Sequence, residues 1–273
     1  MATRVEAAER TLQEGNPHAA LRHLQDAVRE KPADAKLRVF LFQLLAVLGP
    51  WARALAQLDT AATLDAGALA MKQTYHEAIA CELLRAEVFA GRKSPMVLGQ
   101  PEDWLAGLIE SLAHSGRGAG AAAETLRAAA FDQAPATSGT LDGQAFEWIA
   151  DADMRLGPVL EAIVNGRYYW IPFARIARLT IEAPADLRDV VWAPAHIAFA
   201  NGGETVALIP TRYPGSELSE DGAILLSRKT VWSEPRSGVF HGLGQRVLAT
   251  DVAEHPVLEV REIRLSPAAA GGA

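Results

Sequence analysis

A helical spacing of apolar and polar residues runs through the first half of the chain. Residues 1–90 are rich in alanine, leucine, arginine and glutamate, all of which favour helices. A later segment, Trp104–Leu112, is amphipathic because its apolar residues recur at helical intervals. The spacing predicts helices at about 3–14, 17–30, 34–48, 51–63, 67–90, 104–112 and 119–131.

A repeat of 34 residues organises the first of these helices. This is the period of tetratricopeptide repeats, in which paired helices turn tightly at glycine and pack closely at alanine. The sequence predicts two such units, with a plain antiparallel array of helices as the alternative. A third, degenerate unit at Gly118–Pro135 is expected to close the solenoid. The recurring residues are Gly15, Ala20, Leu24 and Ala27, which are matched by Gly49, Ala54, Leu58 and Ala61.

The second half has a different pattern, in which short apolar segments are separated by turn residues. Asn165-Gly166 follows the apolar run Val159–Val164, and both turn residues tolerate the positive φ of a type I′ turn, so a β-hairpin is predicted. Asn201-Gly202-Gly203 predicts a second hairpin. Further strands are expected at 146–151, 156–164, 168–173, 178–182, 195–200, 204–209, 229–232, 245–249 and 257–264, with helical turns at 186–189 and 218–226.

The predicted fold class is therefore α+β. A tetratricopeptide-like α-helical solenoid is expected at residues 1–133, followed by a small, mostly antiparallel β domain at 141–265. The small-residue stretch 134–140 is the expected linker, and 266–273 the expected flexible tail. Short strands at this spacing indicate either a barrel-like arrangement or a curled sheet.

The composition narrows the class of function. A net charge of -7 argues against non-specific binding of nucleic acid, which depends on clustered lysine and arginine. The single cysteine, Cys81, excludes an internal disulfide and a multi-cysteine metal site. The longest apolar run, Val39–Leu48, is far shorter than the ~20 residues of a membrane span. No apolar signal-peptide core begins the chain, so a cytoplasmic location is expected.

The tightest group of carboxylates is Asp151 and Asp153, with Glu147 nearby. These side chains could hold a divalent cation if their oxygens converged. An exposed strand end or turn is the simpler interpretation. The histidines lack the spacing of a helical zinc site, and Gly242-Leu-Gly244 lacks the third glycine of a dinucleotide fingerprint. The residues therefore predict no catalytic group, no metal site and no cofactor.

Stacked helical pairs leave a concave groove that is lined by the first helix of each pair. Mixed polar and apolar residues on that face favour an amphipathic partner helix, while a solvated face is the alternative. By repeat position, the predicted partner-binding residues are Lys36, Val39, Gln43, Gln73 and Glu77.

Several longer runs carry a resemblance to a known family. They are Leu37–Leu45, Asp65–Leu69, Phe146–Asp153, Asn165–Trp170, Asp186–Asp189, Trp192–Pro194 and Ile209–Ser216. In these runs, spread between about Ala19 and Ile263, the chain resembles the ImpE family, also called TagJ. Its members are accessory proteins of bacterial type VI secretion.

The resemblance implies a cytoplasmic, non-enzymatic adaptor associated with the contractile sheath. Members of the family bind the smaller sheath subunit, TssB, through its N-terminal helix. This contact links them to ClpV, the ATPase that dismantles the contracted sheath. The resemblance defines neither a catalytic residue nor the contact residues. Two alternatives stay open: a metal- or anion-dependent enzyme using Asp151, Asp153 and nearby arginines, and a homo-oligomeric scaffold.

Overall fold

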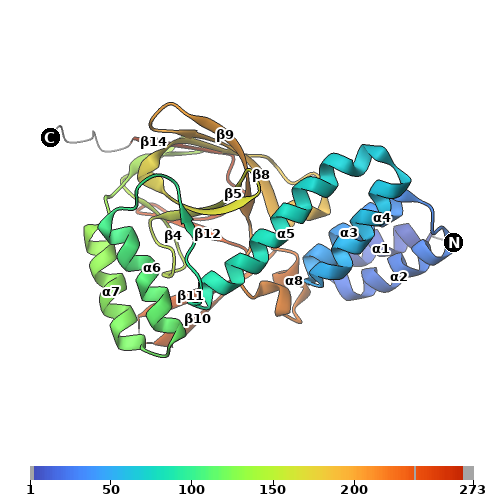
Figure 1. Cartoon of the computed structure of the whole chain (residues 1–273), viewed down its shortest axis with the longest axis horizontal. Coiled ribbons are helices and arrows are strands. Elements are labelled where there is room, and N and C mark those ends of the chain that lie inside the picture. The colour runs from blue at the N-terminus through green and yellow to red at the C-terminus, as the bar shows by residue number, and fades with distance from the viewer. Residues whose placement is uncertain (1–2, 237, 267–273) are drawn as a thin grey trace.

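The computed structural model describes residues 3–236 and 238–266. A helical array lies at one end of the molecule and a curled sheet at the other, and the long helix α5 (Leu69–Phe89) runs diagonally between them (Figure 1). Most of the predicted tail, 267–273, lies outside the described residues. Ser266 is the last residue of the final strand.

The predicted helices are confirmed to within a few residues at most of their ends. Pairing is antiparallel in the N-terminal array, and the elements are α1 (Arg4–Gln13), α2 (Pro17–Glu30), α3 (Ala35–Leu48) and α4 (Trp51–Leu64). Thr3 and Glu6 form a capping box at the start of α1, and Asp34 caps α3. Among the described helices, none is both long and apolar enough to cross a membrane.

The two repeat glycines explain the 34-residue period. Gly15 and Gly49 both have a positive φ, of 81° and 93°, which glycine adopts without steric cost. Gly49 is the left-handed residue that ends α3. A Cβ at Gly49 would also lie 2.9 Å from the Cβ of Glu217, so this turn is packed closely against the second half of the chain. Assignment of the pairs to the tetratricopeptide class stays a prediction.

The third helical pair is present but does not close the solenoid. Helices α6 (Asp103–Gly116) and α7 (Gly120–Gln133) pack on each other at the opposite end of α5 from α1–α4 (Figure 1). The loop between α5 and α6 contains the short strand β1 (Met96–Val97), which pairs with the sheet and carries the chain away from the array.

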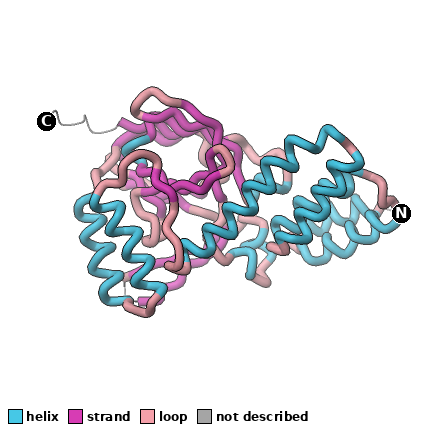
Figure 2. The backbone as a smooth tube through the Cα atoms, viewed as in Figure 1, coloured by secondary structure: helices cyan, strands magenta, loops and turns pink. Residues whose placement is uncertain are grey.

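Three sheets are found within the described residues. The largest contains nine strands in the order β1-β6-β5-β9-β8-β7-β14-β2-β3, and every pairing in it except β1–β6 is antiparallel. Its edge strands, β1 and β3, do not pair with each other in the described part of the chain, so the curled sheet is confirmed rather than a closed barrel (Figure 2). Bounds are β2 Ser138–Leu141, β3 Gln144–Phe146, β5 Val159–Val164, β6 Arg167–Pro172, β7 Ile176–Ile181, β8 Trp192–Phe199, β9 Glu204–Pro210 and β14 Glu262–Ser266.

Two smaller sheets complete the β part. One contains β4 (Ile149–Asp151), β12 (Val247–Thr250) and β13 (Glu254–Pro256). The other pairs β10 (Thr230–Arg236) with β11 (Val239–Gly244), a strand that the sequence pattern did not predict. A short helix, α8 (Gly222–Leu225), occupies part of the segment expected to be helical at 218–226.

Three predictions about this half were wrong in detail. The expected linker contains the start of β2, because Ser138 pairs with Ser266 of β14. The strand expected at 146–151 is divided into β3 and β4. The strand expected at 257–264 is replaced by β13 and β14, with a turn between them that Asp142 stabilises by accepting from the Arg261 and Glu262 amides.

The predicted hairpin is confirmed as β5–β6, with Val164 opposite Arg167. Asn165 and Gly166 have φ values of 48° and 71°, as a type I′ turn requires. The turn lies against α5, where the buried Cys81 thiol donates to the Gly166 carbonyl oxygen at 3.4 Å. The β5–β6 turn is therefore attached to the helical half.

The helices and the sheet share a hydrophobic core. One cluster joins Phe42 of α3 and Tyr75 of α5 to Ile163 and Trp192 of the sheet. The Trp192 ring lies 5.5 Å from the Tyr75 ring. A second cluster, which includes Leu160, lies on the other face of the sheet. The division of the chain into two domains at 134–140 stays a prediction.

Candidate functional site

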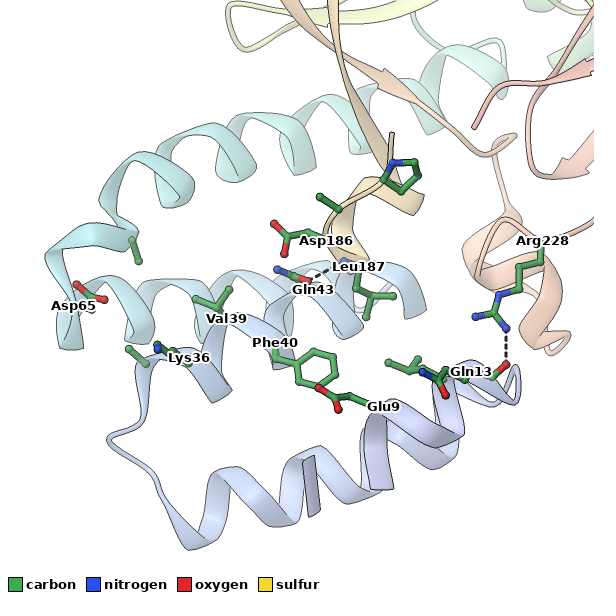
Figure 3. Close-up of a pocket in the computed structure, with 15 residues that line it drawn as sticks. Glu9, Gln13, Lys36, Val39, Phe40, Gln43, Asp65, Asp186, Leu187 and Arg228 are labelled. Atoms are coloured by element: carbon green, nitrogen blue, oxygen red, sulfur yellow. Dashed lines mark hydrogen bonds between the residues drawn. The ribbon is translucent and has the colours of Figure 1, made fainter. Parts of the chain in front are cut away.

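A cavity of about 950 Å³ lies on the inner face of the helical array. One wall comes from α1 and α3, and the other comes from residues 184–187 of the β part (Figure 3). We call this cavity the groove. Its apolar lining includes Leu12, Val39, Phe40 and Leu187. These residues form an apolar surface between two parts of the chain that are distant in sequence.

Three of the five predicted partner-binding residues line the groove: Lys36, Val39 and Gln43. The other two, Gln73 and Glu77, lie on α5 and are hydrogen-bonded to each other. Glu77 lines a separate cavity beside the β5–β6 turn. The predicted residues are therefore distributed over two surfaces.

Gln43 holds the second wall in place. Its side chain is 6% exposed, and Oε1 accepts a hydrogen bond from the Leu187 amide at 3.1 Å (Figure 3). Arg188 extends from the same segment over the Tyr75 ring, with 5.3 Å between the guanidinium carbon and the ring centroid. The carboxylate of Asp189 accepts from the amides of Ala185 and Asp186, which stabilises the local turn. This wall was not predicted, although the Asp186–Asp189 run belongs to it.

A second hydrogen bond between the β part and the helical array lies near the end of α1, where Arg228 Nη1 donates to the Gln13 carbonyl oxygen at 2.9 Å (Figure 3). Lys36 and Glu9 are exposed at the groove, and neither forms a salt bridge with any residue that the structure describes. Their charges are therefore available to a partner. The groove combines an apolar centre with free charges at its rim, a composition that suits an amphipathic helix.

The candidate carboxylates Asp151 and Asp153 do not line an open site, because they are only 3% and 0% exposed. Arg246 Nη1 donates to Asp151 at 2.8 Å, and the Tyr213 hydroxyl donates to it at 3.0 Å. Asp153 is ion-paired with Arg155. A substrate or hydrated cation could not reach these carboxylates without opening the core. The described residues contain no group of three or more potential metal ligands.

Asp151 belongs to a larger buried polar network centred on Glu161 of β5. Arg85 of α5 donates to both Glu161 oxygens, from Nε at 2.7 Å and from Nη2 at 2.8 Å. Arg246 and the Tyr168 hydroxyl donate to the same carboxylate. Because Arg85 comes from a helix and the other groups from the β part, the network attaches α5 to the β part.

The pKa values of the two central carboxyl groups are shifted in opposite directions. Burial raises the pKa of Asp151 to about 7, because desolvation outweighs the attraction of Arg246. Burial also raises the pKa of Glu161, but the guanidinium groups of Arg85 and Arg246 together outweigh it and lower the pKa to about 2. Glu161 is therefore held ionised as the acceptor at the centre of the network.

Sequence inspection missed the network because its members are far apart in the chain. A partial signal exists in the pattern: Glu161 is the single charged residue within the otherwise apolar run Val159–Val164. Such charges are almost never fully buried unless they are paired. Trp192 adds a further link, since its indole Nε1 donates to Glu82 of α5 at 2.9 Å.

Known proteins are similar to this chain over most of its length. A family model described as ImpE protein matches residues 143–264. A Pseudomonas aeruginosa protein, the type VI secretion system accessory component TagJ, is 52% identical over 95% of this chain and 91% of its own length. The crystal structure of protein VPA1032 from Vibrio parahaemolyticus has the same fold. It has a TM-score of 0.86 at 24% identity and covers 95% of this chain and 97% of that one.

Proposed function

The chain belongs to the ImpE family, and from this premise we propose that it is a non-enzymatic adaptor of type VI secretion. It binds the small sheath subunit, TssB, through that subunit's N-terminal helix, and so links the cytoplasmic sheath to turnover by ClpV. The observation that carries the proposal is the nearly full-length similarity to a type VI secretion accessory component. The burial of Asp151 and Asp153 supports a role without catalysis.

We place the contact in the groove. A helix bound there would set its apolar face against Val39, Phe40 and Leu187. Lys36 and Glu9 could then pair with charges at the edges of that face. The remaining predicted residues, Gln73 and Glu77, lie outside this contact. The β part takes a direct share in binding, because residues 184–187 form one wall.

Binding to the purified sheath heterodimer tests the proposal by titration calorimetry. Wild-type protein is expected to bind at micromolar concentration or below. Val39→Asp places a charge in the apolar centre of the groove, and we expect it to weaken binding at least tenfold, or about 1.4 kcal/mol. Lys36→Glu reverses a free charge at the rim and should produce a smaller loss.

The matched control is Arg29→Glu, a charge reversal on α2. Arg29 is 73% exposed and does not line the groove. Its substitution should leave affinity unchanged. Absence of binding to either sheath subunit by the wild type would contradict the adaptor role. Normal binding by folded Val39→Asp would retain the role but move the contact away from the groove.

A further inference from the structure

A second cavity, of about 300 Å³, lies between α5, the β5–β6 turn and the strands β8 and β9. Its apolar lining includes Ile163, Val206 and Leu208. Two carboxylate-bearing residues, Glu77 and Glu182, lie at its boundary. The cavity thus combines an apolar floor with negative charge.

These two carboxylates have no basic partner among the described residues. Within the described ranges, neither Glu77 nor Glu182 takes part in a salt bridge, and the hydrogen bond from Gln73 to Glu77 brings no charge. Glu77 lies close to the turn, since a Cβ at Gly166 would meet its Oε2. The carboxylate of Glu182 is exposed. Both groups are therefore available to a cation that enters from outside.

Strand β9 presents part of an open edge beside this cavity. The Phe199 amide donates to the Gly203 carbonyl oxygen at 2.8 Å, so residue 203 faces β8. Because antiparallel strands alternate the direction of their backbone groups, residues 204, 206 and 208 face the other edge. Leu208 is paired there with Ile163 of β5, but β5 ends at Val164. The backbone groups of Val206 therefore lack a strand partner among the described residues.

Two details support an open edge at this position. Val206 is 72% exposed although it is apolar. Among the described residues, its carbonyl oxygen accepts from the neighbouring Thr205 hydroxyl, at 3.1 Å, a contact that an incoming backbone amide could replace. Exposed strand edges in native proteins are usually protected by lysine, proline or a covering segment. Of the open residues here, Glu204 carries a charge, which can also protect an edge, but Val206 has none of these features.

We propose that this cavity and edge bind an extended segment of a partner protein that carries a lysine or arginine. The segment adds to β9 beyond the end of β5 and pairs with the backbone of Val206. The methylenes of its basic side chain cover Leu208 and Ile163, and the cationic head lies between Glu77 and Glu182. Charge complementarity and the open edge select this partner. The inference concerns a different surface from the groove and does not depend on the sheath contact.

Amide chemical shifts of isotope-labelled full-length protein test the proposal. The probe is the blocked peptide acetyl-Thr-Val-Lys-Val-Thr-amide, and its matched control has glutamate in place of lysine. With the lysine peptide, shift changes are expected at residues 74–77, 163–166 and 204–208, with a dissociation constant on the order of 1 mM. No change, or equal changes with the glutamate peptide, would overturn the proposal.

Two variants and one control separate the backbone and charge contributions. Val206→Pro removes the outward amide without removing a β8–β9 hydrogen bond and should abolish binding, whereas Val206→Thr keeps the amide and should bind normally. Glu182→Gln, at an exposed position, should weaken binding several-fold. Unchanged affinity in folded Val206→Pro or in Glu182→Gln contradicts the proposal. Shift changes at this surface that grow with protein concentration in the absence of peptide would assign it to contact with a second copy of the chain. They would also overturn the proposal.

Discussion

Glu161→Gln is the sharpest test of how the two halves are held together. The Glu161 carboxylate is fully buried, and it is the shared acceptor for Arg85, Arg246 and Tyr168. The amide has one acceptor oxygen and no charge. The substitution therefore leaves two buried guanidinium groups without their common counterion, at the point where α5 meets the sheet.

The expected cost is large for a substitution of nearly equal volume. Breaking a buried ion pair by removing one partner costs about 3–5 kcal/mol, because the remaining charge stays in a low-dielectric interior. One kcal/mol corresponds to a change in Tm of about 2–4 °C for a chain of this size. The melting temperature should therefore fall by roughly 6–20 °C.

Urea unfolding followed by tryptophan fluorescence measures this cost, with Glu262→Gln as the control. Glu262 accepts from Arg264 at 2.7 Å, but the two side chains are 38% and 60% exposed. Loss of this exposed pair should cost less than about 1 kcal/mol. If Glu161→Gln is no more destabilising than the control, the network does not hold α5 to the sheet and the reasoning is refuted.

Two further predictions concern the same region. Because the pKa of Asp151 is raised from 3.8 to about 7, its stabilising contribution is complete below pH 3.8 and is lost as the pH rises through 7. The unfolding free energy of the wild type minus that of Asp151→Asn should therefore decline between pH 4 and 8. Burial lowers the pKa of His241 to about 4, but this group is present in both proteins, so its contribution cancels in the difference. A difference that stays flat between pH 4 and 8 would contradict the raised pKa of Asp151. Gly166→Ala should destabilise by more than Gly143→Ala in urea unfolding. Both positions have positive φ, but a Cβ at Gly166 would also meet the Glu77 side chain, which would have to shift. Equal losses would show that the Glu77 side chain moves aside without cost.

Much of the fold could be predicted because the decisive signals are local. Helical periodicity predicted α1–α4, and the repeat glycines marked the ends of α1 and α3, since a left-handed turn favours glycine. The Asn165-Gly166 turn was equally local. Strands without such signals were missed or merged, as for β11 and for the segment at 146–151. Phe146 is buried while Trp148 is 41% exposed, so one continuous alternating strand could not describe both.

The site was only partly predictable because its second wall depends on long-range contacts. Repeat position identified Lys36, Val39 and Gln43 as groove residues. Nothing local shows that Leu187, which is 144 positions from Gln43, would lie opposite them. The third helical pair illustrates the same limit. Its internal spacing was recognisable, but its place at the far end of α5 depends on β1 pairing with the sheet.

The most direct measurement of the central claim is amide hydrogen exchange of the protein with and without the small sheath subunit. We expect slower exchange at residues 36–43 of α3 and at 185–187 of the opposite wall when the subunit is bound. Exchange around the buried network near Glu161 should not change. Protection confined to other surfaces, with α3 and the 184–187 wall unaffected, would contradict a helix bound in the groove.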